Sequence, residues 1–473
     1  MNIKILSHAC VLLSTSSHSI VIDPWLFGSC YWRSWWNFPE PVIDESELAE
    51  VDAVVISHIH WDHWHGPTLK KMFKGKPIYV PDEPGLRSER DLKSIGFDVV
   101  HRVPHASTVK VGDIALTMYQ FGLFLNDAAI VVEAGGVTLL NANDAKIAGW
   151  ALRHLISRHG RFDFALRSHS SANSRICFKI EGKSDYVADD REHYFRSFCA
   201  FMDVVQPRYA IPFASNHCHL HDDVYGLNSY ISNPLQLRDY VSQLSPGPLH
   251  WQLVMMLPGS NWSPTAGFAL RSESAFKRLE EELAAYRLRV APRLEAYKQY
   301  ENAVLVNATM FGRFVDMLQL QALPKGAHGE LMVTIRWPDG RGTTYVLSLP
   351  DLTWQEAPFT RHSEPGRPNL VFPAVVFRDA VVKNMFHHAG ISKRCEFLAR
   401  SEADLGRVHA LLGLLEGIEL GRYPIRWGYV VRVVSAYARR WRELFVYAQA
   451  AWLIKIRRKP LYLAEEAILR GEF

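Results

Sequence analysis

The segment VVISHIHWDHWHG, residues 54–66, constrains this chain more than any other part of its sequence. It places four histidines and one aspartate within eight residues, directly after an apolar run that is typical of a buried strand. Side chains two residues apart on an extended loop point to the same side, so His58 and His60 can bind one metal ion. Asp62 and His63 then face a neighbouring position for a second ion. The H-x-H-x-D-H spacing after a strand therefore predicts a dimetal site.

His65, the fourth histidine, falls outside this spacing. We expect it to support the ligands from behind or to lie at the surface.

Composition and charge exclude several classes of protein. The 473 residues are 48% hydrophobic and 22% charged, as in a soluble globular protein of two or three domains. The net charge of +4 and the pI near 8.6 are too mild to indicate nucleic-acid binding. Six scattered cysteines without a C-x-x-C pair favour a reducing cytoplasm. The start MNIKILSHAC does not read as a signal peptide, and no apolar run of about 18 residues predicts a transmembrane helix.

Short apolar runs separated by polar turns predict strands along the first third of the chain. The expected strands cover residues 3–6, 10–14, 20–22, 53–56, 78–80, 99–103, 114–119, 128–132 and 138–140. A short helix is expected after Pro67. Strands interrupted by short helices, with polar residues at strand ends, indicate a layered α/β architecture.

The character of the sequence changes near residue 270, where apolar residues begin to recur at helical spacing. The residues that carry this pattern are Phe276, Leu279, Leu283, Tyr286 and Val290. We therefore divide the chain into residues 1–270, a metal-binding catalytic domain, and residues 271–473, whose role the sequence leaves open. A hairpin is expected to turn at Asp339 and Gly340, and helices are expected at residues 402–416 and 429–456.

The helix expected at residues 429–456 mixes arginine and lysine with tryptophan, phenylalanine and leucine. An interfacial membrane helix has such a composition, and so has a buried helix whose basic residues reach solvent at its edges. The large number of apolar positions favours the buried helix.

Six of the 14 tryptophans flank the histidine loop, at positions Trp25, Trp32, Trp35, Trp36, Trp61 and Trp64. Tryptophan is ordinarily core, which is the simplest interpretation. The alternative is the wall of a pocket for a flat or apolar group of a substrate.

The histidine loop at the end of a strand resembles the signature of the metallo-β-lactamase fold superfamily. The resemblance implies an αββα sandwich with a dimetal site at one edge of its two sheets, followed here by a C-terminal α+β and helical region. It also implies further ligands. The segment VTLLNANDAK offers Asp144 as a bridging carboxylate, and RYAIPFASNHCHLHDD offers His217, His219 and His221 for the histidine after the final strand.

One element of the superfamily pattern is missing, namely a histidine between the first motif and the bridging aspartate. The segment LTMYQFGLFLNDAAIVVE contains none, and His105 comes too early because the strand expected at residues 114–119 must intervene. Gln120, Asn126 and Asp127 are the candidates for this position. An oxygen ligand there favours iron or manganese over zinc.

A closer resemblance is to CMP-N-acetylneuraminate hydroxylase and its bacterial relatives. It is carried, in order, by DPWLFGSCYWRSWW, DAVVISHIHWDHWHGPTLKKM, GVTLLNANDAK and QPRYAIPFASNHCHLHDD, over residues 23–223. The family's spacing after PFA selects His221 as the final ligand. These hydroxylases insert oxygen into an N-acyl group of a nucleotide-linked sugar, using iron and electrons from a Rieske cluster. The paired C-x-H and C-x-x-H units of a Rieske centre are absent from this chain, which implies a separate electron-donor protein.

The loop in DFALRSHSSANSRICF adds candidates for substrate contact or for support of the ligands. They are Arg167, His169, Ser170, Ser171 and Asn173. Trp61 and Asp127 are further candidates of the same kind.

Two enzymatic hypotheses use the same ligand set, which is His58, His60, Asp62, His63, Asp144 and His221. The first is a dimetal oxygenase, with iron favoured, that hydroxylates a small polar metabolite of N-acylated or nucleotide-sugar-like type. The second is a zinc or manganese hydrolase of an ester, lactone, amide or phosphoester, in which Asp62 orients a metal-bound hydroxide. A third hypothesis is a non-catalytic metal or ligand site. The missing histidine and the closer resemblance favour the oxygenase, with Asp62 and Asp144 as its catalytic carboxylates.

Overall fold

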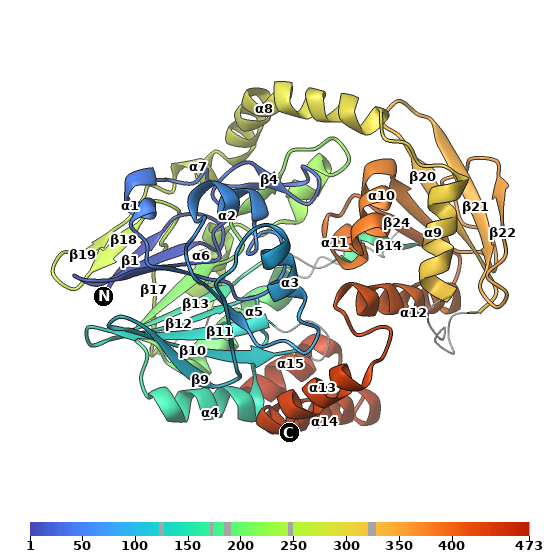
Figure 1. Cartoon of the computed structure of the whole chain (residues 1–473). Coiled ribbons are helices and arrows are strands. Elements are labelled where there is room, and N and C mark those ends of the chain that lie inside the picture. Colours follow the sequence, from blue (N-terminus) through green and yellow to red (C-terminus); the bar gives the residue numbers. More distant parts are fainter. Residues whose placement is uncertain (123–126, 171–173, 184–190, 245–248, 320–327, 473) are drawn as a thin grey trace.

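Two β-sheets packed face to face form the centre of the N-terminal region (Figure 1). The computed structural model describes residues 1–122, 127–170, 174–183, 191–244, 249–319 and 328–472. The first sheet has eight strands, in the order β19 (Gly267–Ala269), β18 (Asn261–Ser263), β1 (Asn2–Ile5), β2 (Val11–Ser14), β3 (Ser19–Ile22), β6 (Ala53–Val55), β7 (Ile78–Pro81) and β8 (Val100–Val103). The second has seven, in the order β17 (Gln252–Leu253), β15 (Tyr209–Phe213), β13 (Phe164–Ser168), β12 (Val137–Asn143), β11 (Asp127–Ala134), β10 (Ile114–Phe121) and β9 (Ser107–Val111).

Buried aliphatic side chains from both sheets meet between them, among them Ile3 and Val11 of the first and Leu116 and Ile130 of the second. Helices cover the outer faces. Those on the first sheet are α1 (Glu45–Ala49), α2 (Gly66–Met72) and α3 (Arg87–Ser94). Those on the second are α4 (Gly149–His159), α5 (Arg191–Val205) and α6 (Pro234–Gln243). The expected αββα sandwich is therefore confirmed.

The strands expected in the first third of the chain are present, and the largest difference lies in β12. It extends to Asn143 instead of ending at Leu140, because Asn141 and Asn143 continue the pairing with β13 through an irregular register. Asparagine has low strand propensity, so the extension depends on the neighbouring strand. The extension is important because it places Asp144 directly after the end of β12.

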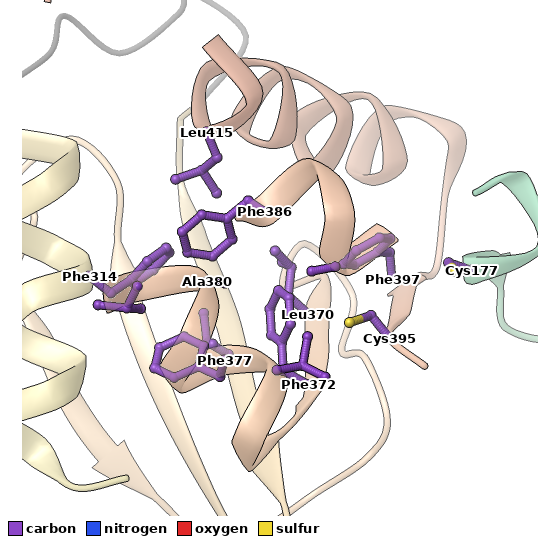
Figure 2. Close-up of a cluster of buried hydrophobic side chains, with 14 of the residues drawn as sticks. Cys177, Phe314, Leu370, Phe372, Phe377, Ala380, Phe386, Cys395, Phe397 and Leu415 are labelled. Atoms are coloured by element: carbon purple, nitrogen blue, oxygen red, sulfur yellow. The ribbon is translucent and has the colours of Figure 1, made fainter. Parts of the chain in front are cut away.

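A third sheet forms the C-terminal region (Figure 1). Its six strands follow the order β14 (Phe178–Ile180), β24 (Glu396–Ala399), β23 (Asn369–Pro373), β20 (Glu330–Arg336), β21 (Gly342–Ser348) and β22 (Trp354–Ala357). The predicted hairpin is the antiparallel pair β20 and β21. Helices α9 (Ala308–Gln319), α10 (Ala374–Lys383), α11 (Phe386–Ile391) and α12 (Glu402–Glu419) pack with the sheet. Figure 2 shows the aromatic core they share, with Phe314, Phe372, Phe377, Phe386 and Phe397 at its centre.

Two segments cross the division that the sequence suggests at residue 270. Strand β14 belongs to the third sheet, where it pairs in parallel with β24. Helices α14 (Trp441–Ala451) and α15 (Leu461–Arg470) return to the second sheet, and Val446 and Ile468 join its outer core. The division into residues 1–270 and 271–473 stays a prediction, and the two regions contact each other through both crossing segments.

The prediction of a single helix at residues 429–456 is wrong, because the structure divides this segment. Helix α13 (Trp427–Arg439) is capped by Arg440, α14 follows, and a π-helical turn covers Trp452–Ile456. The break lets Arg440 donate to the carbonyl of Gly122 at 2.8 Å, while Glu443 accepts from the Gly122 amide at 2.7 Å. The expected burial is also wrong for α13, which buries none of its residues. Among the described helices, none is both long enough and apolar enough to cross a membrane.

Helix α8 (Leu279–Asn302) spans the top of the molecule in Figure 1 and ends at a buried ion network. The face predicted from its spacing is buried, with Leu283, Tyr286 and Val290 inside. At the far end, buried Arg394 donates to Glu301 at 2.6 Å and to Asp223 at 2.8 Å. This network connects α8, the chain after β16 (His217–His219) and the third sheet.

We expect Arg394→Met to lower the free energy of unfolding by roughly 3–5 kcal/mol, because it leaves the carboxylate of Glu301 buried without its cation. Arg289 is the matched control, since its ion pair with Glu40 is half exposed. Arg289→Met should cost less than about 1 kcal/mol. Urea denaturation measures the free energy of unfolding of both variants. Equal losses in the two variants would contradict a stabilising role of the buried ion network.

Candidate metal centre

The histidine loop begins where β6 ends, at the rim of the sandwich. Its turn is closed by the amides of His63 and Trp64, which both donate to the carbonyl of His60, at 2.9 and 2.6 Å. His65 then caps α2, because its ring accepts from the Thr68 amide at 3.3 Å. Burial lowers the pKa of His65 to about 4, which keeps that ring neutral and able to accept. His65 therefore serves the helix start and not the metal cluster.

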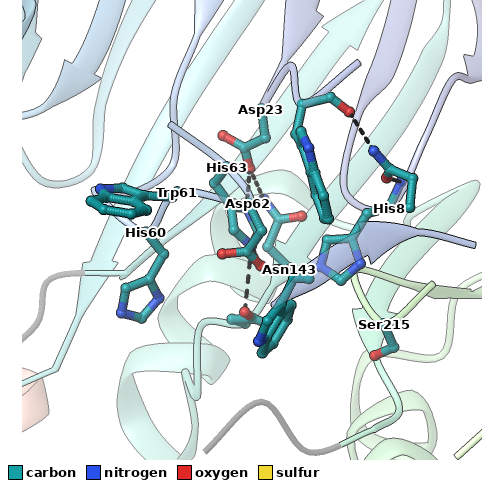
Figure 3. Close-up of polar contacts among 12 residues, drawn as sticks. His8, Asp23, His60, Trp61, Asp62, His63, Asn143 and Ser215 are labelled. Carbon is teal, nitrogen blue, oxygen red and sulfur yellow. Dashed lines mark hydrogen bonds and ion pairs between the residues drawn. The ribbon is translucent and has the colours of Figure 1, made fainter. Parts of the chain in front are cut away.

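The carboxylate of Asp23 organises the centre from behind (Figure 3). Asp23 follows β3 in a left-handed conformation, with a φ of 51°, and is fully buried. It accepts from the Ser57 amide at 2.7 Å, from the Ser57 hydroxyl at 2.6 Å and from the Asn143 amide group at 2.8 Å. Its fourth partner is Nδ1 of His63, also at 2.8 Å. Nδ1 thus carries the proton, and Nε2 of His63 is left to face the centre.

Two groups of ligand atoms meet at His63. Its Nε2 lies 3.4 Å from a carboxylate oxygen of Asp62 and 3.4 Å from one of Asp144. One group is His58, His63 and Asp144, the other is His8, Asp62 and His63, and within each the ligand atoms lie within 4.8 Å of one another. The sequence-predicted residues His58, Asp62, His63 and Asp144 are thus brought together. His8, whose Nε2 lies 3.1 Å from Asp62, was missed, although SHAC after the first strand carries a histidine at a strand end.

His60 lies on the other side of the cluster from His8, as Figure 3 shows. Its Nδ1 is 2.8 Å from Nε2 of His58, as expected for paired ligands. Its Nε2 is 2.9 Å from Nε2 of His387, which belongs to α11 of the C-terminal region. Sequence reasoning missed His387, because only the tertiary fold brings that region against the loop.

The histidine selected by sequence spacing lies apart from these ligands. His221 contacts Glu301 at 3.3 Å and accepts from the Asp223 amide at 3.1 Å, next to the buried ion network. His217 is buried, stacks on Trp35 with ring centroids 3.9 Å apart, and lies 5.4 Å from the His8 ring. Within the described residues, neither ring nitrogen of His217 has a hydrogen-bond partner. His219, the third alternative, turns its Nδ1 toward Ser34.

Among the candidates for the position of the missing histidine, Asp127 interacts electrostatically with Asp144, His63 and Asp62 of the cluster. Burial, followed by the charge of Asp144, raises the pKa of Asp127 to about 8. One carboxylate oxygen of Asp127 is buried without a partner in the described part of the chain. Gln120 instead donates to the Val103 carbonyl at 3.3 Å. Asn126, Ser171 and Asn173 lie outside the described residues.

The remaining candidates are placed as follows. Arg167 donates to Ser197 at 3.2 Å and lies 4.1 Å above the Phe201 ring, so it contacts α5. His169 is buried, and neither of its ring nitrogens has a partner among the described residues. The amides of His169 and Ser170 both donate to Ser215, at 3.0 and 3.1 Å.

The electrostatics suit bound cations. Burial, followed by the charge of His63, lowers the pKa of His58 to about 4, so this ring is a neutral ligand near pH 7. Burial opposes a proton on His63, yet the carboxylates of Asp62 and Asp23 hold its pKa well above the ordinary value. The cluster thus has an excess of negative charge, together with buried nitrogen and oxygen atoms that lack partners among the described residues. These residues fit a dinuclear metal site.

A cavity of about 640 Å³ adjoins the histidine loop, where α3 and α11 face each other. Its walls include Tyr31, Trp32, Arg33, Trp61, Trp64, Tyr297, Met385 and His388. Tyr31, Trp32 and Arg33 have φ angles of 49°, 54° and 64°, an uncommon left-handed run that the surrounding structure must hold in place. Tyr31 also donates to Asp62 at 2.5 Å, which connects the wall to the cluster. The six tryptophans that flank the histidine loop therefore have two roles. Trp25, Trp35 and Trp36 belong to the core, and Trp32, Trp61 and Trp64 line the cavity.

Comparisons with known proteins place this architecture. Residues 2–160 match the model of the beta-lactamase superfamily domain. A protein of Mycobacterium tuberculosis that carries the name Rieske 2Fe-2S iron-sulfur protein is 27% identical over 328 residues, which cover 63% of this chain and 62% of the relative. The cytidine monophosphate-N-acetylneuraminic acid hydroxylase of Cricetulus griseus is 28% identical over 254 residues, or 51% of this chain and 45% of the hydroxylase. The chain thus spans between about half and two thirds of the length of these relatives.

Among solved structures, CmlA, a diiron beta-hydroxylase from Streptomyces venezuelae, matches at 17% identity and a TM-score of 0.35, covering 50% of this chain and 48% of CmlA. Metal-dependent hydrolases also occur among the similar structures. The resemblance predicted from the sequence is confirmed: residues 2–160 carry a β-lactamase superfamily domain, and about half of the chain is similar to the CMP-N-acetylneuraminate hydroxylases.

Proposed function

We propose that this chain is a non-heme dimetal hydroxylase, with iron as the favoured metal, acting on a small metabolite. The observation that carries the proposal is the oxygen-rich surroundings of His63, where carboxylate oxygens of Asp62 and Asp144 lie at 3.4 Å and the carboxylate of Asp127 interacts electrostatically with Asp144 and His63. Carboxylate-rich sites favour iron or manganese over zinc. Similarity to proteins named as a hydroxylase and as a Rieske iron-sulfur protein supports oxygen chemistry.

The proposed ligands are His58, His60, Asp62, His63 and Asp144, as the sequence predicts, with Asp127 as an added oxygen ligand. For the final histidine we propose His217 in place of His221, because His217 is buried beside His8 while His221 is held by Glu301. His8 lies next to Asp62 and can complete the second position.

Iron ions bound by these side chains would supply the activation of O2 that hydroxylation requires. The chain itself supplies orientation, because Asp23 fixes the ring of His63 through Nδ1. Trp32, Trp61 and Trp64 give the neighbouring cavity aromatic walls that exclude water from a bound substrate.

Arg33 sets a preference for charge in the substrate. It lines the same cavity, where its guanidinium donates to the Ser29 hydroxyl at 3.1 Å and lies 5.4 Å from the centre of the Tyr297 ring, so it can bind an anionic group there. An N-acylated or nucleotide-sugar-like metabolite would satisfy both features. Electrons would come from a separate iron-sulfur donor protein.

The second candidate function is a hydrolase, and the beta-lactamase superfamily match of residues 2–160 favours it. The same ligands would then bind zinc or manganese, and Asp62 would orient a metal-bound hydroxide toward an ester, lactone, amide or phosphoester.

The metal content separates the two functions. Protein purified from iron-replete cells should contain two irons per chain and show a visible absorption band that a reductant bleaches. Elemental analysis and absorption spectroscopy on the same sample measure both. Stoichiometric zinc, together with turnover of a generic ester or phosphodiester, would refute the hydroxylase.

The final ligand can be tested by two substitutions only four residues apart. His217→Ala should lower the bound metal by about one ion per chain, whereas His221→Ala should retain the full content, because His221 contacts Glu301 and not the cluster. His60→Ala should empty the paired-histidine position. His250, an exposed histidine, gives the control His250→Ala with unchanged metal. Retention of both ions in His217→Ala would restore His221 as the candidate.

His387 is expected to position His60 from the C-terminal region. A metal-binding histidine usually directs its second ring nitrogen to a hydrogen-bond partner, and substitution of that partner lowers metal affinity by about 10–100-fold. His387 is itself anchored, because its amide donates to Glu419 at 2.6 Å.

We therefore expect His387→Leu to weaken metal binding by about 10–100-fold in competition with a chelator. His387→Gln keeps a polar group toward Nε2 of His60 and should recover much of the affinity. Equal affinities of the two variants would show that His387 only fills space.

A further inference from the structure

Helices α13 and α14 both present large apolar side chains to solvent. Trp427, Val431 and Val434 are 81%, 50% and 64% exposed, and their spacing places them on one face of α13. Trp441 and Phe445 of α14 are 42% and 45% exposed, and the Phe445 ring also packs against Trp150 of α4, with ring centroids 4.8 Å apart. We call these five side chains the α13–α14 stripe. Isolated exposed apolar residues are ordinary, whereas several large ones gathered on two successive helices mark an interaction surface.

The opposite side of α13 is the one that contacts the protein. Arg432 donates to the Pro84 carbonyl at 2.7 Å, and Arg432, Ser435 and Ala436 line a small cavity together with Gln120. Figure 1 shows α13 and α14 at the outer edge of the molecule, beside α4 and α15. The α13 part of the stripe, which is Trp427, Val431 and Val434, therefore faces away from the body of the protein.

The segment of the chain that carries the stripe is strongly basic. Residues 425–460 contain nine arginines and lysines and one acidic residue, a net charge of +8, compared with +4 for the whole chain. The acidic residue is Glu443, which is buried and paired with Arg440 at 2.7 Å. Arg442 lies 4.5 Å above the ring of Trp441, so a cation directly borders the stripe.

We propose that the α13–α14 stripe binds the surface of an anionic lipid membrane. A helix with tryptophan and aliphatic residues on its outer face and many basic residues beside them lies in the membrane interface, where the rings enter the headgroup region and the cations contact acidic lipids. An acidic protein partner would neutralise the charge, but it would also have to offer an apolar strip matched along both helices. A fluid anionic lipid surface can accommodate the apolar side chains and neutralise the basic ones at the same time. This surface is independent of the metal chemistry.

Sedimentation of the full chain with lipid vesicles tests the proposal. The protein should sediment with vesicles of phosphatidylcholine and phosphatidylglycerol and stay in solution with phosphatidylcholine alone, and high salt should release it. The triple variant W427S/V431N/V434N should lower the partition coefficient at least about tenfold. Replacing Arg457 or Lys459 by Gln should lower it about fivefold each.

Leu288 and Leu305 give a matched control, since they are 76% and 82% exposed but lie outside the stripe. L288S/L305N should bind the vesicles like the unaltered protein. Trp427→Ser alone changes one highly exposed residue, so it keeps the test valid if the triple variant fails to fold. Unchanged vesicle binding by Trp427→Ser and the triple variant would overturn the proposal. Equal binding to neutral vesicles, or a lipid-free dimer that the triple variant abolishes, would also overturn it.

Discussion

The carboxylate of Asp23 is the interaction on which the rest of the centre depends. It joins the end of β3, the start of the histidine loop at Ser57 and the end of β12 at Asn143, which come from both sheets of the sandwich. By accepting from Nδ1 of His63, it also decides which ring nitrogen faces the two ligand groups. A single buried acceptor thus sets the distance between the sheets at this rim and the tautomer of the shared histidine.

The C-terminal region is part of the same arrangement. His388 contacts Glu419 and, through Nε2, the carbonyl of Ile59 at 3.2 Å, so α11 holds the histidine loop by its backbone. His387 reaches His60 beside it. The cavity wall is built from both regions, with Trp61 on one side and Tyr297 and Met385 on the other. Movement of the third sheet relative to the sandwich would therefore disturb the ligands and the cavity together.

The sequence predicts those features of the fold and of the site that depend on residues close together in the chain. The histidine loop and the strands before it follow from apolar periodicity and spacing, whereas Asp144 follows from the resemblance to the metallo-β-lactamase fold superfamily. The structure brings His58, Asp62, His63 and Asp144 together. The sequence does not predict His8 or His387, because their proximity depends on how distant loops meet and not on spacing along the chain. It offers His217 only as an alternative to His221, since spacing alone does not show which of the two rings lies beside His8. The sequence does not predict the break at Arg440 for a similar reason. The helical pattern continues through Arg440, but Arg440 and Glu443 form hydrogen bonds with the distant backbone of Gly122.

The choice between oxygen chemistry and hydrolysis comes down to a few side chains around one histidine. Three histidines at the first position would make a nitrogen-rich site suited to zinc, whereas the proposed carboxylate ligand Asp127 would make that position harder. The same carboxylate, close to Asp144, is costly without cations, because burial and the charge of Asp144 raise the pKa of Asp127 to about 8. Two bound cations would remove that cost, and the aromatic walls of the neighbouring cavity would help to protect a reactive oxidant from side reactions. Asp127, the proposed replacement for the histidine that the superfamily pattern lacks here, is therefore the residue on which the oxygenase proposal most depends.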